Sequence, residues 1–310
     1  MSTPWRQRMF PAVLSLAAIA AAACAQDTQP AAAPEATVAP APDNKAAAKP
    51  HEDVDPKNFE RSTVIDNPWL PMKPGTRLTY EGTTIEDDGT AVPHKVLITI
   101  TDLTKVISGI RSVVSWDLDY SNGELVEAEV AFFAQDNDGS VWRIGEYPEE
   151  YEDGKFITAP AWLHGIEGAV AGIEMRAKPE LGTPSYSQGW GPGVNFTDRG
   201  QVDQVGQKTC VPVKCYEDVV VIAEVSAVEA DAQQLKYFAS GVGNVRVAWR
   251  GKGEKTRETL ELTKVEQLGP AELAKVRAEA LKLEKSAYSR SKNVYAQTPP
   301  AESAPVALGQ

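Results

Sequence analysis

The sequence predicts an all-β domain, an antiparallel meander that forms a curved sheet, a sandwich or an open barrel, followed by one amphipathic C-terminal helix. From about residue 75 onward, apolar and polar residues alternate with a period of two in many short runs, which is typical of half-buried strands. Glycine-containing turn signals separate most of these runs, and Asn122-Gly123 is the clearest hairpin signal among them. No segment has the pattern of a strand–helix–strand unit, so an antiparallel sheet is expected. The predicted strands lie at residues 77–80, 96–100, 112–116, 125–133, 140–144, 219–228, 234–238, 245–249 and 259–265.

A helix is predicted at residues 270–288, where the periodicity changes from two to about 3.6. Pro270 suits the first turn of a helix, because the N–H that proline lacks has no partner there. One face of the segment is apolar and consists of Leu273, Val276, Ala280, Leu283 and Ala287. We expect this face to pack on the sheet or to cover an edge strand. A helix that binds a partner protein is the alternative.

The N-terminal end has the features of an export signal. Arg6 and Arg8 precede an apolar run that is too short to span a membrane. Cys24 follows directly after small residues, as the acylated cysteine of bacterial lipoproteins does, although Ala21 stands where such signals usually carry Leu. Lipidation of Cys24 is predicted, and ordinary cleavage after Ala25 is the alternative. Because Ala rather than Asp follows the cysteine, we expect a lipid anchor in the outer membrane, with the protein in the periplasm or at the cell surface.

Composition divides the chain into five parts. Residues 26–57 hold six prolines, many alanines and few bulky apolar side chains, and such a stretch buries too little surface to offset the entropy of ordering it. An extended tether is expected there, with a tail of similar composition at the other end. The predicted parts are a signal peptide (1–23), a disordered Ala/Pro-rich tether (24–57), a β-rich domain (58–268), a helix packed on it (270–288) and a disordered tail (291–310).

Charge and residue usage argue against several classes of function. The chain has 43 Asp and Glu against 31 Lys and Arg, a net charge of −12, whereas nucleic-acid binding needs clustered basic residues. Three His, with no pair at metal-ligand spacing, and three Cys argue against a zinc site. The sequence contains no G-x-S-x-G, H-E-x-x-H or phosphate-loop motif. No cofactor is predicted, and a non-enzymatic protein is favoured.

Four stretches carry a further signal. They are IDNPWLPMKPGTRLTYEG (65–82), FFAQDNDGSVWRIGE (132–146), GIEGAVAGIEM (165–175) and YFASGVGNVR (237–246). In their order and spacing they resemble a widespread group of uncharacterised bacterial secreted proteins and lipoproteins, and the resemblance covers about residues 65–262. It implies an all-β envelope protein and no particular activity. The cysteine pair and the C-terminal helix are outside what the resemblance explains.

Two cysteines of the predicted body are close in sequence. Cys210 and Cys215 enclose Val-Pro-Val-Lys between two predicted strands. In an exported protein such a pair is expected to form a disulfide bond that closes the tip of a hairpin. A redox-active pair is the alternative, but such pairs usually have two intervening residues and a helix N-terminus.

Residues 117–153 are the most acidic part of the chain, with twelve acids and one base and therefore a net charge of −11. Asp136-Asn137-Asp138-Gly139 is similar to the opening of a calcium loop. However, residue 147 is Tyr, where an EF-hand needs its bidentate Glu. A Gly-closed turn with solvated acids is favoured. A weak Ca²⁺ site formed by Asp136, Asp138 and Glu146 is the alternative.

Residues 160–205 break the alternating pattern and are rich in Gly and Pro. A long loop region in a compact domain often forms a binding loop or a lid. Trp162 and Trp190 lie in it, so they are candidate ligand-binding residues that close over a concavity. Core packing is the alternative.

These observations together predict a non-enzymatic envelope lipoprotein that binds an envelope component or an apolar ligand in its curved sheet. The alternatives are a structural or assembly subunit that docks on another envelope protein and, third, a hydrolase.

Overall fold

A computed structural model of the chain describes residues 49–303, apart from residues 87, 228–230 and 255–256. The described residues form the strands β1 (Thr76–Ile85), β2 (Ala91–Ile107), β3 (Ile110–Ser121), β4 (Glu124–Gln135), β5 (Val141–Glu152), β6 (Lys155–Thr158), β7 (Trp162–Leu163), β8 (Val170–Met175), β9 (Tyr186–Ser187), β10 (Gly189–Trp190), β11 (Arg199–Val211), β12 (Lys214–Val225), β13 (Gln233–Ala239), β14 (Gly243–Arg250), β15 (Arg257–Gln267) and β16 (Glu302–Ser303). They also form the helix α1 (Pro270–Arg290) and three short 3-10 helices at Pro56–Asn58, Pro192–Val194 and Tyr295–Gln297.

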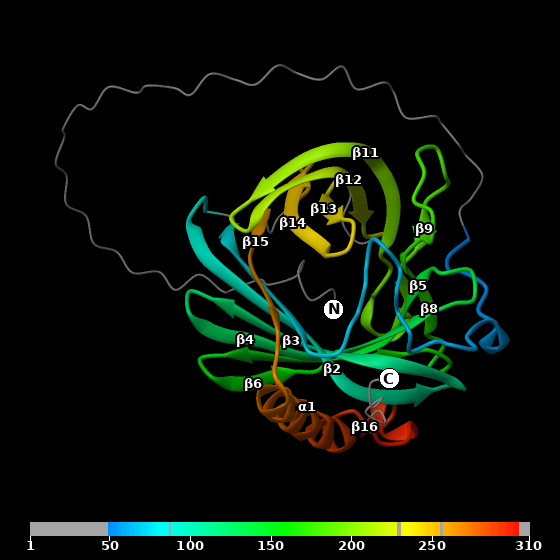
Figure 1. The fold of residues 1–310 in the computed structure, drawn as a ribbon. Helices are drawn as coiled ribbons and strands as arrows, with labels where there is room; N and C mark the ends of the chain where they lie inside the picture. Colours follow the sequence, from blue (N-terminus) through cyan, green and yellow to red (C-terminus); the bar gives the residue numbers. More distant parts are fainter. Residues whose placement is uncertain (1–48, 87, 228–230, 255–256, 304–310) are drawn as a thin grey trace, which may run out of the picture.

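The strands belong to one strongly curved antiparallel sheet (Figure 1), which confirms the predicted all-β class with one C-terminal helix. They are hydrogen-bonded in the order β10-β8-β5-β4-β3-β2-β1-β15-β14-β13-β12-β11-β9, and β6, β7 and β16 pair at the sides. Each predicted run of alternating residues overlaps one of these strands. In the turn between β3 and β4, Asn122 has a φ of 51° and Gly123 a φ of 84°. Positive values at both central residues are what the Asn-Gly signal predicts.

One short segment bridges the two ends of the sheet. Strand β9 pairs with β11 at one end of the strand order, and β10, one residue further on, pairs with β8 at the other end. The sheet therefore curls round and encloses an interior. Gly172 permits the close crossing on β8, because a Cβ atom there would lie 2.2 Å from the backbone nitrogen of Gly189.

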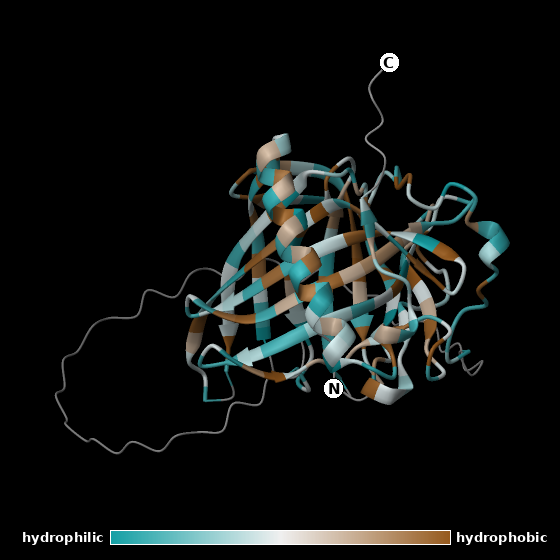
Figure 2. Cartoon of the chain, turned by 90° about the horizontal axis from the view of Figure 1, so that it is seen from below, coloured by the Kyte–Doolittle hydropathy of each residue, from teal (hydrophilic) through white to brown (hydrophobic). Residues whose placement is uncertain are grey.

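Strand β4 is buried on both of its faces. Val130 and Phe132 belong to an apolar core on the outer side of the sheet, whereas Glu129 and Phe133 face the interior. Helix α1 crosses the outer face of the strands (Figure 2) and adds buried residues, such as Leu283, to the outer core. Because the helix covers this side, the alternation along β4 separates two buried faces rather than a core face and a solvent face.

Helix α1 begins at the predicted proline and ends two residues beyond the predicted helix. In the predicted apolar stripe, four residues are buried and Leu273 is half-buried. The helix contacts β2 and β4, so the stripe packs on the sheet as expected. Within the part of the chain that the structure describes, no helix is long and apolar enough to cross a membrane.

A buried lysine attaches the C-terminal part of the chain to β2. The ammonium group of Lys105 is fully buried and donates hydrogen bonds to Glu284 Oε1 at 2.8 Å, to the Tyr288 hydroxyl at 3.0 Å and to the Pro299 carbonyl at 2.6 Å. These partners come from α1 and from the segment after it. The Lys105 side chain on the sheet therefore binds both α1 and the segment that follows it.

Two stretches that were predicted to be disordered are ordered over the residues that the structure describes. In the tail, Tyr295 is 1% exposed and its ring lies 5.2 Å from that of Tyr147, while β16 pairs with β2. In the tether, Glu52 Oε1 accepts a hydrogen bond from the Ser187 backbone N–H at 2.9 Å. Composition could not predict this order, because it depends on single side chains, Tyr295 and Glu52, that attach each stretch to the domain. Cys24, residues 25–48 of the tether and residues 304–310 lie outside the described residues.

Candidate functional site

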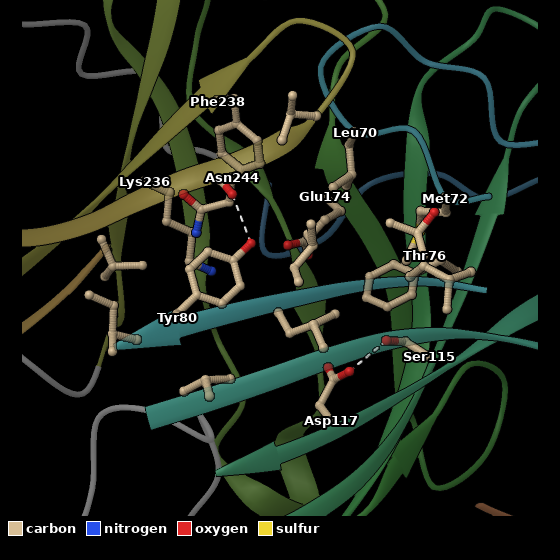
Figure 3. Close-up of a pocket in the computed structure, with 18 of the residues that line it drawn as sticks. Leu70, Met72, Thr76, Tyr80, Ser115, Asp117, Glu174, Lys236, Phe238 and Asn244 are labelled. Carbon is tan, nitrogen blue, oxygen red and sulfur yellow. Dashed lines mark hydrogen bonds between the residues drawn. The ribbon is translucent and has the colours of Figure 1, made fainter. Parts of the chain in front are cut away.

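The curved sheet encloses a cavity of about 110 Å³ (Figure 3). Residues from β1 to β5 and β8 line one side of it, and residues from β13 to β15 line the other. Leu70 and Val242 are half-buried and also line the cavity. Their two loops are joined by a hydrogen bond from Gly241 N to the Pro68 carbonyl at 2.7 Å. We take these loops as the mouth of the cavity, because their lining residues still reach solvent.

Every second side chain along a strand points to the same face, so alternate residues line the cavity. The clearest sets are Thr76, Leu78 and Tyr80 on β1, Val96, Ile98 and Ile100 on β2, and Gln234, Lys236 and Phe238 on β13. Most of these side chains are apolar, and they form the larger part of the wall. The Tyr80 hydroxyl is satisfied by donating to the Asn244 carbonyl at 2.7 Å.

The polar part of the wall centres on Arg143 of β5. Its Nη1 donates to Glu146 Oε2 at 2.7 Å, its Nε donates to Glu174 Oε2 at 3.0 Å, and Nη1 lies 3.9 Å from Glu129 Oε1. Ile144 is skipped in the pairing between β4 and β5, which is a β-bulge. The bulge lets Arg143 and Glu146 meet although they are three residues apart in a strand. The guanidinium also lies 5.0 Å from the ring centre of Phe133.

Two carboxyl groups on the wall face each other across neighbouring strands. Asp117 on β3 is directly opposite Glu129 on β4, and the Ser115 hydroxyl donates to Asp117 Oδ1 at 2.6 Å. Burial raises the pKa of Asp117 to about 7, although Ser115 and the charge of Arg143 act in the opposite direction. Burial likewise raises the pKa of Glu129 well above its usual range, and the charge of Glu146 adds to this.

Lys236, the other base on the wall, is also paired. Its Nζ lies 2.7 Å from Glu224 Oε2, and Gln188 Nε2 donates to Glu224 Oε1 at 2.6 Å. Burial alone would lower the pKa of Lys236, but the charges of Glu224 and Glu174 outweigh it and raise that pKa. The bond from Gln188 links the bridging segment between β9 and β10 to this interior ion pair.

His94 is held between two acids beyond the cavity. Its Nε2 lies 2.7 Å from Asp119 Oδ1, and its Nδ1 lies 2.7 Å from Glu258 Oε1. Burial by itself would lower the pKa of His94. The hydrogen bonds to the two carboxylates outweigh burial and raise the pKa to about 10, so the imidazole is charged at neutral pH. This interaction connects β2, β3 and β15 at one end of the interior.

The two tryptophans predicted to bind a ligand are not among the residues that line this cavity. Trp162 is 2% exposed and packs on Phe196 with ring centres 4.8 Å apart, as the core-packing alternative expects. Trp190 is half-buried in β10. The predicted irregular region contains β7 to β10, so Trp162 packs there as a core residue. A Cβ atom at Gly189 would lie 2.6 Å from the Trp162 ring, which shows how tightly this ring is held.

Two of the three candidate calcium ligands have other partners. Asp136 accepts hydrogen bonds from the backbone N–H groups of Asp138 and Ser140 and from Trp142 Nε1 at 2.7 Å. Glu146 is fully buried beside Arg143, whereas Asp138 is exposed in the turn. In the described part of the chain, no group of three or more His, Cys, Asp or Glu is arranged to hold a metal ion.

Cys210 and Cys215 form the disulfide bond predicted from their spacing. They are opposite each other in the hairpin of β11 and β12. Closing so short a loop is worth about 2 kcal/mol by chain entropy. The bond stabilises the hairpin tip, and neither cysteine lines the cavity.

Sequence reasoning missed the interior acids. Glu129 was not singled out and Glu146 was considered only as a calcium ligand, but they are 3% and 0% exposed. For Glu129 the available signal was the alternation of acidic and apolar residues on β4, which places Glu127 and Glu129 on one face. That pattern does not tell which face is covered, and the helix that covers the opposite face is far away in sequence.

No protein-family model and no curated protein matches the chain. Two solved structures show a distant likeness, each with 12% sequence identity and each covering 64% of this chain and 98% of the other. One is described as a "putative exported protein with YMCC-like fold" from Bacteroides fragilis NCTC 9343, with a TM-score of 0.37. The other is a "putative lipoprotein" from Parabacteroides distasonis ATCC 8503, with a TM-score of 0.38. These TM-scores are too low to support an argument about this chain.

Proposed function

We propose that this protein is a non-enzymatic envelope lipoprotein that binds a small molecule with an apolar body inside its curved sheet. The observation that carries the proposal is the interior cavity, with its mostly apolar wall and a few convergent polar groups. Protein interiors leave few voids larger than a water molecule. A hollow of this composition inside a sheet is therefore the default binding site of the molecule.

The size of the cavity limits the ligand. At about 110 Å³ the cavity is large enough to hold a small molecule. It is also smaller than the roughly 150 Å³ of an engineered cavity that holds benzene. A small molecule fits this space better than a long acyl chain would. Among the envelope components and apolar ligands that the sequence left open, this favours a small one.

The sequence supports a location in the envelope, and the structure bears on the two alternative functions. The export signal at residues 1–23 and the small residues before Cys24 support anchoring in the envelope. Docking through α1 is less well supported, because the apolar stripe of the helix is already buried against the sheet. No described residue of the cavity wall is a His or Cys. A hydrolase built on a cysteine nucleophile or on a histidine-activated serine is therefore not supported by this wall.

A variant that obstructs the mouth tests the proposal. Val242→Trp adds a large ring at a half-buried position that lines the cavity. Val213→Trp is the matched control, since Val213 is an exposed residue in a hairpin turn outside the lining. The wild type and both variants are purified from the host envelope. Small molecules released on denaturation are then measured by mass spectrometry.

We expect one small molecule to accompany the wild type and Val213→Trp in a fixed ratio and to be strongly depleted in Val242→Trp. Circular dichroism melting shows whether each variant is folded. Equal amounts of the molecule in all three folded proteins, or none in the wild type, would overturn the proposal.

A further inference from the structure

The acidic and basic groups on the cavity wall are unequal in number. Four acids line it, Asp117, Glu129, Glu174 and Glu258, against the two bases Arg143 and Lys236. Both bases are already paired with carboxylates. Arg143 donates to Glu174 and Glu146, and Lys236 lies 2.7 Å from Glu224. An anionic ligand would have to displace one of these acids from its base, and the displaced carboxylate would then be buried without a partner.

Asp117 and Glu129 are the acids of the wall that are not hydrogen-bonded directly to a base. They are directly opposite each other in the register of β3 and β4, which places their Cβ atoms about 5 Å apart. Asp117 receives one hydrogen bond, from Ser115. Glu129 is 3% exposed, and no N–H group donates to its Oε1, since the Arg143 Nη1 atom is 3.9 Å away. Its carboxyl group also interacts with the carboxyl group of Glu146. Like charges in this arrangement repel, so a cation placed between them gains from both.

The surroundings of this pair suit an organic cation. Asp117 lies on β3 at one side of the cavity, and Phe238 lies on β13 at the other (Figure 3). The rings of Tyr80 and Phe238 line the cavity, and aromatic rings attract cations to their faces. In the described residues no cluster is arranged to hold a metal ion. A hydrated inorganic ion would also gain nothing from the apolar wall.

We propose that the ligand is a small alkylammonium-type cation, whose positive group is held by Asp117 and Glu129 and whose apolar body lies against the wall formed by residues such as Leu78 and Ile98. This inference rests on the proposed function, because it names the chemical class of the molecule that the cavity binds. It also assigns the interior acids a role, since they become the polar end of the binding site.

Protons occupy the place of the cation when the cavity is empty. Burial raises the pKa of Asp117 to about 7 and that of Glu129 well above its usual range. The groups that face them are Ser115, Arg143, Glu146 and Glu174. A bound ammonium group favours the ionised carboxylate, so binding near neutral pH releases protons.

Three probes of equal length test the charge of the ligand. The full-length mature protein is titrated calorimetrically with n-butylammonium, 1-butanol and butyrate at matched ionic strength, at pH 7 and in two buffers of different ionisation enthalpy. We expect n-butylammonium to bind at least about tenfold more tightly than 1-butanol, the value of one charge-assisted interaction. Butyrate should bind most weakly. Proton release should appear with the ammonium probe and not with the alcohol.

Asp117→Asn removes one charge without changing the size of the side chain, and it should abolish the preference for the ammonium probe. Glu81→Gln is the control, because Glu81 lies on β1 but is exposed and does not line the cavity. If Asp117→Asn fails to fold, the ranking of the three probes on the wild type decides. Equal or stronger binding of 1-butanol or butyrate overturns the cation while the cavity site stands. If none of the three probes binds, both the cation and the proposed function fail.

Discussion

Replacing Lys105 tests how the C-terminal helix is attached to the sheet. Lys105→Met keeps an unbranched side chain of similar length and removes the ammonium group. The change deletes three hydrogen bonds, to Glu284, Tyr288 and the Pro299 carbonyl, and leaves the Glu284 carboxylate buried without its cation. Removing one partner of a buried ion pair costs about 3–5 kcal/mol. The Tyr295 hydroxyl and the Ala301 N–H still donate to Glu284, so we expect a loss of about 3 kcal/mol.

The assay for Lys105→Met is urea unfolding followed by circular dichroism. Lys282→Met is the matched control on α1, since Lys282 is exposed and its pairing with Glu279 is at the surface. We expect this control to change stability by less than about 0.5 kcal/mol. The double variant Lys105→Met with Glu284→Gln should recover part of the loss, because it no longer buries an unpaired charge. If Lys105→Met is as stable as the control, the reasoning about this buried pair is refuted.

Three further outcomes are expected. The pKa values of Asp117, Glu129 and Glu146 are raised in the folded protein, so stability should fall as the pH rises from about 5 to 8. Asp117→Asn should make this pH dependence weaker. A melting temperature that rises over this pH range in calorimetry would contradict the expectation. Trp162→Ala should cost about 3–5 kcal/mol in urea unfolding, as expected for a buried core ring, and a loss under 1 kcal/mol would argue against core packing. Calcium should raise the melting temperature gradually and no more than sodium at equal ionic strength, and a saturable rise abolished by Asp136→Asn would instead indicate a site.

Sequence periodicity predicted nine of the strands, because each of these carries its own local signal, but it missed β6 to β11 and β16. The run at residues 125–133 became β4, and the Asn122-Gly123 turn before it has the expected positive φ values. The same periodicity could not show which face of a strand points to the interior of the sheet. It shows that Glu127 and Glu129 share a face of β4, but only long-range packing shows that this face is the interior. Helix α1 covers the other face, and the acids therefore face inward.

The candidate site was harder to predict because its parts meet through long-range contacts. Arg143 and Glu146 are three residues apart and would point to opposite faces of a regular strand, but the bulge at Ile144 brings them together. Asp117 faces Glu129 through strand pairing, in a register that depends on the hairpin and on an irregularity between Asp119 and Tyr120. Tyr295 lies in a segment of low-complexity composition, and its burial depends on its contacts with α1 and the sheet. Only the disulfide between Cys210 and Cys215 followed from spacing alone.

The most direct test of the central claim is methyl NMR of the methionines during ligand titration. The chain has four methionines, and two of them, Met72 and Met175, lie in the described residues. Met72 lines the cavity, whereas Met175 is fully buried in the same inner core without lining it. Titration of ¹³C-methyl-methionine protein with n-butylammonium or 1-butanol should shift the Met72 signal saturably and leave Met175 nearly unchanged. If neither signal shifts, or both drift linearly without saturation, the interior of the curved sheet is not a binding site.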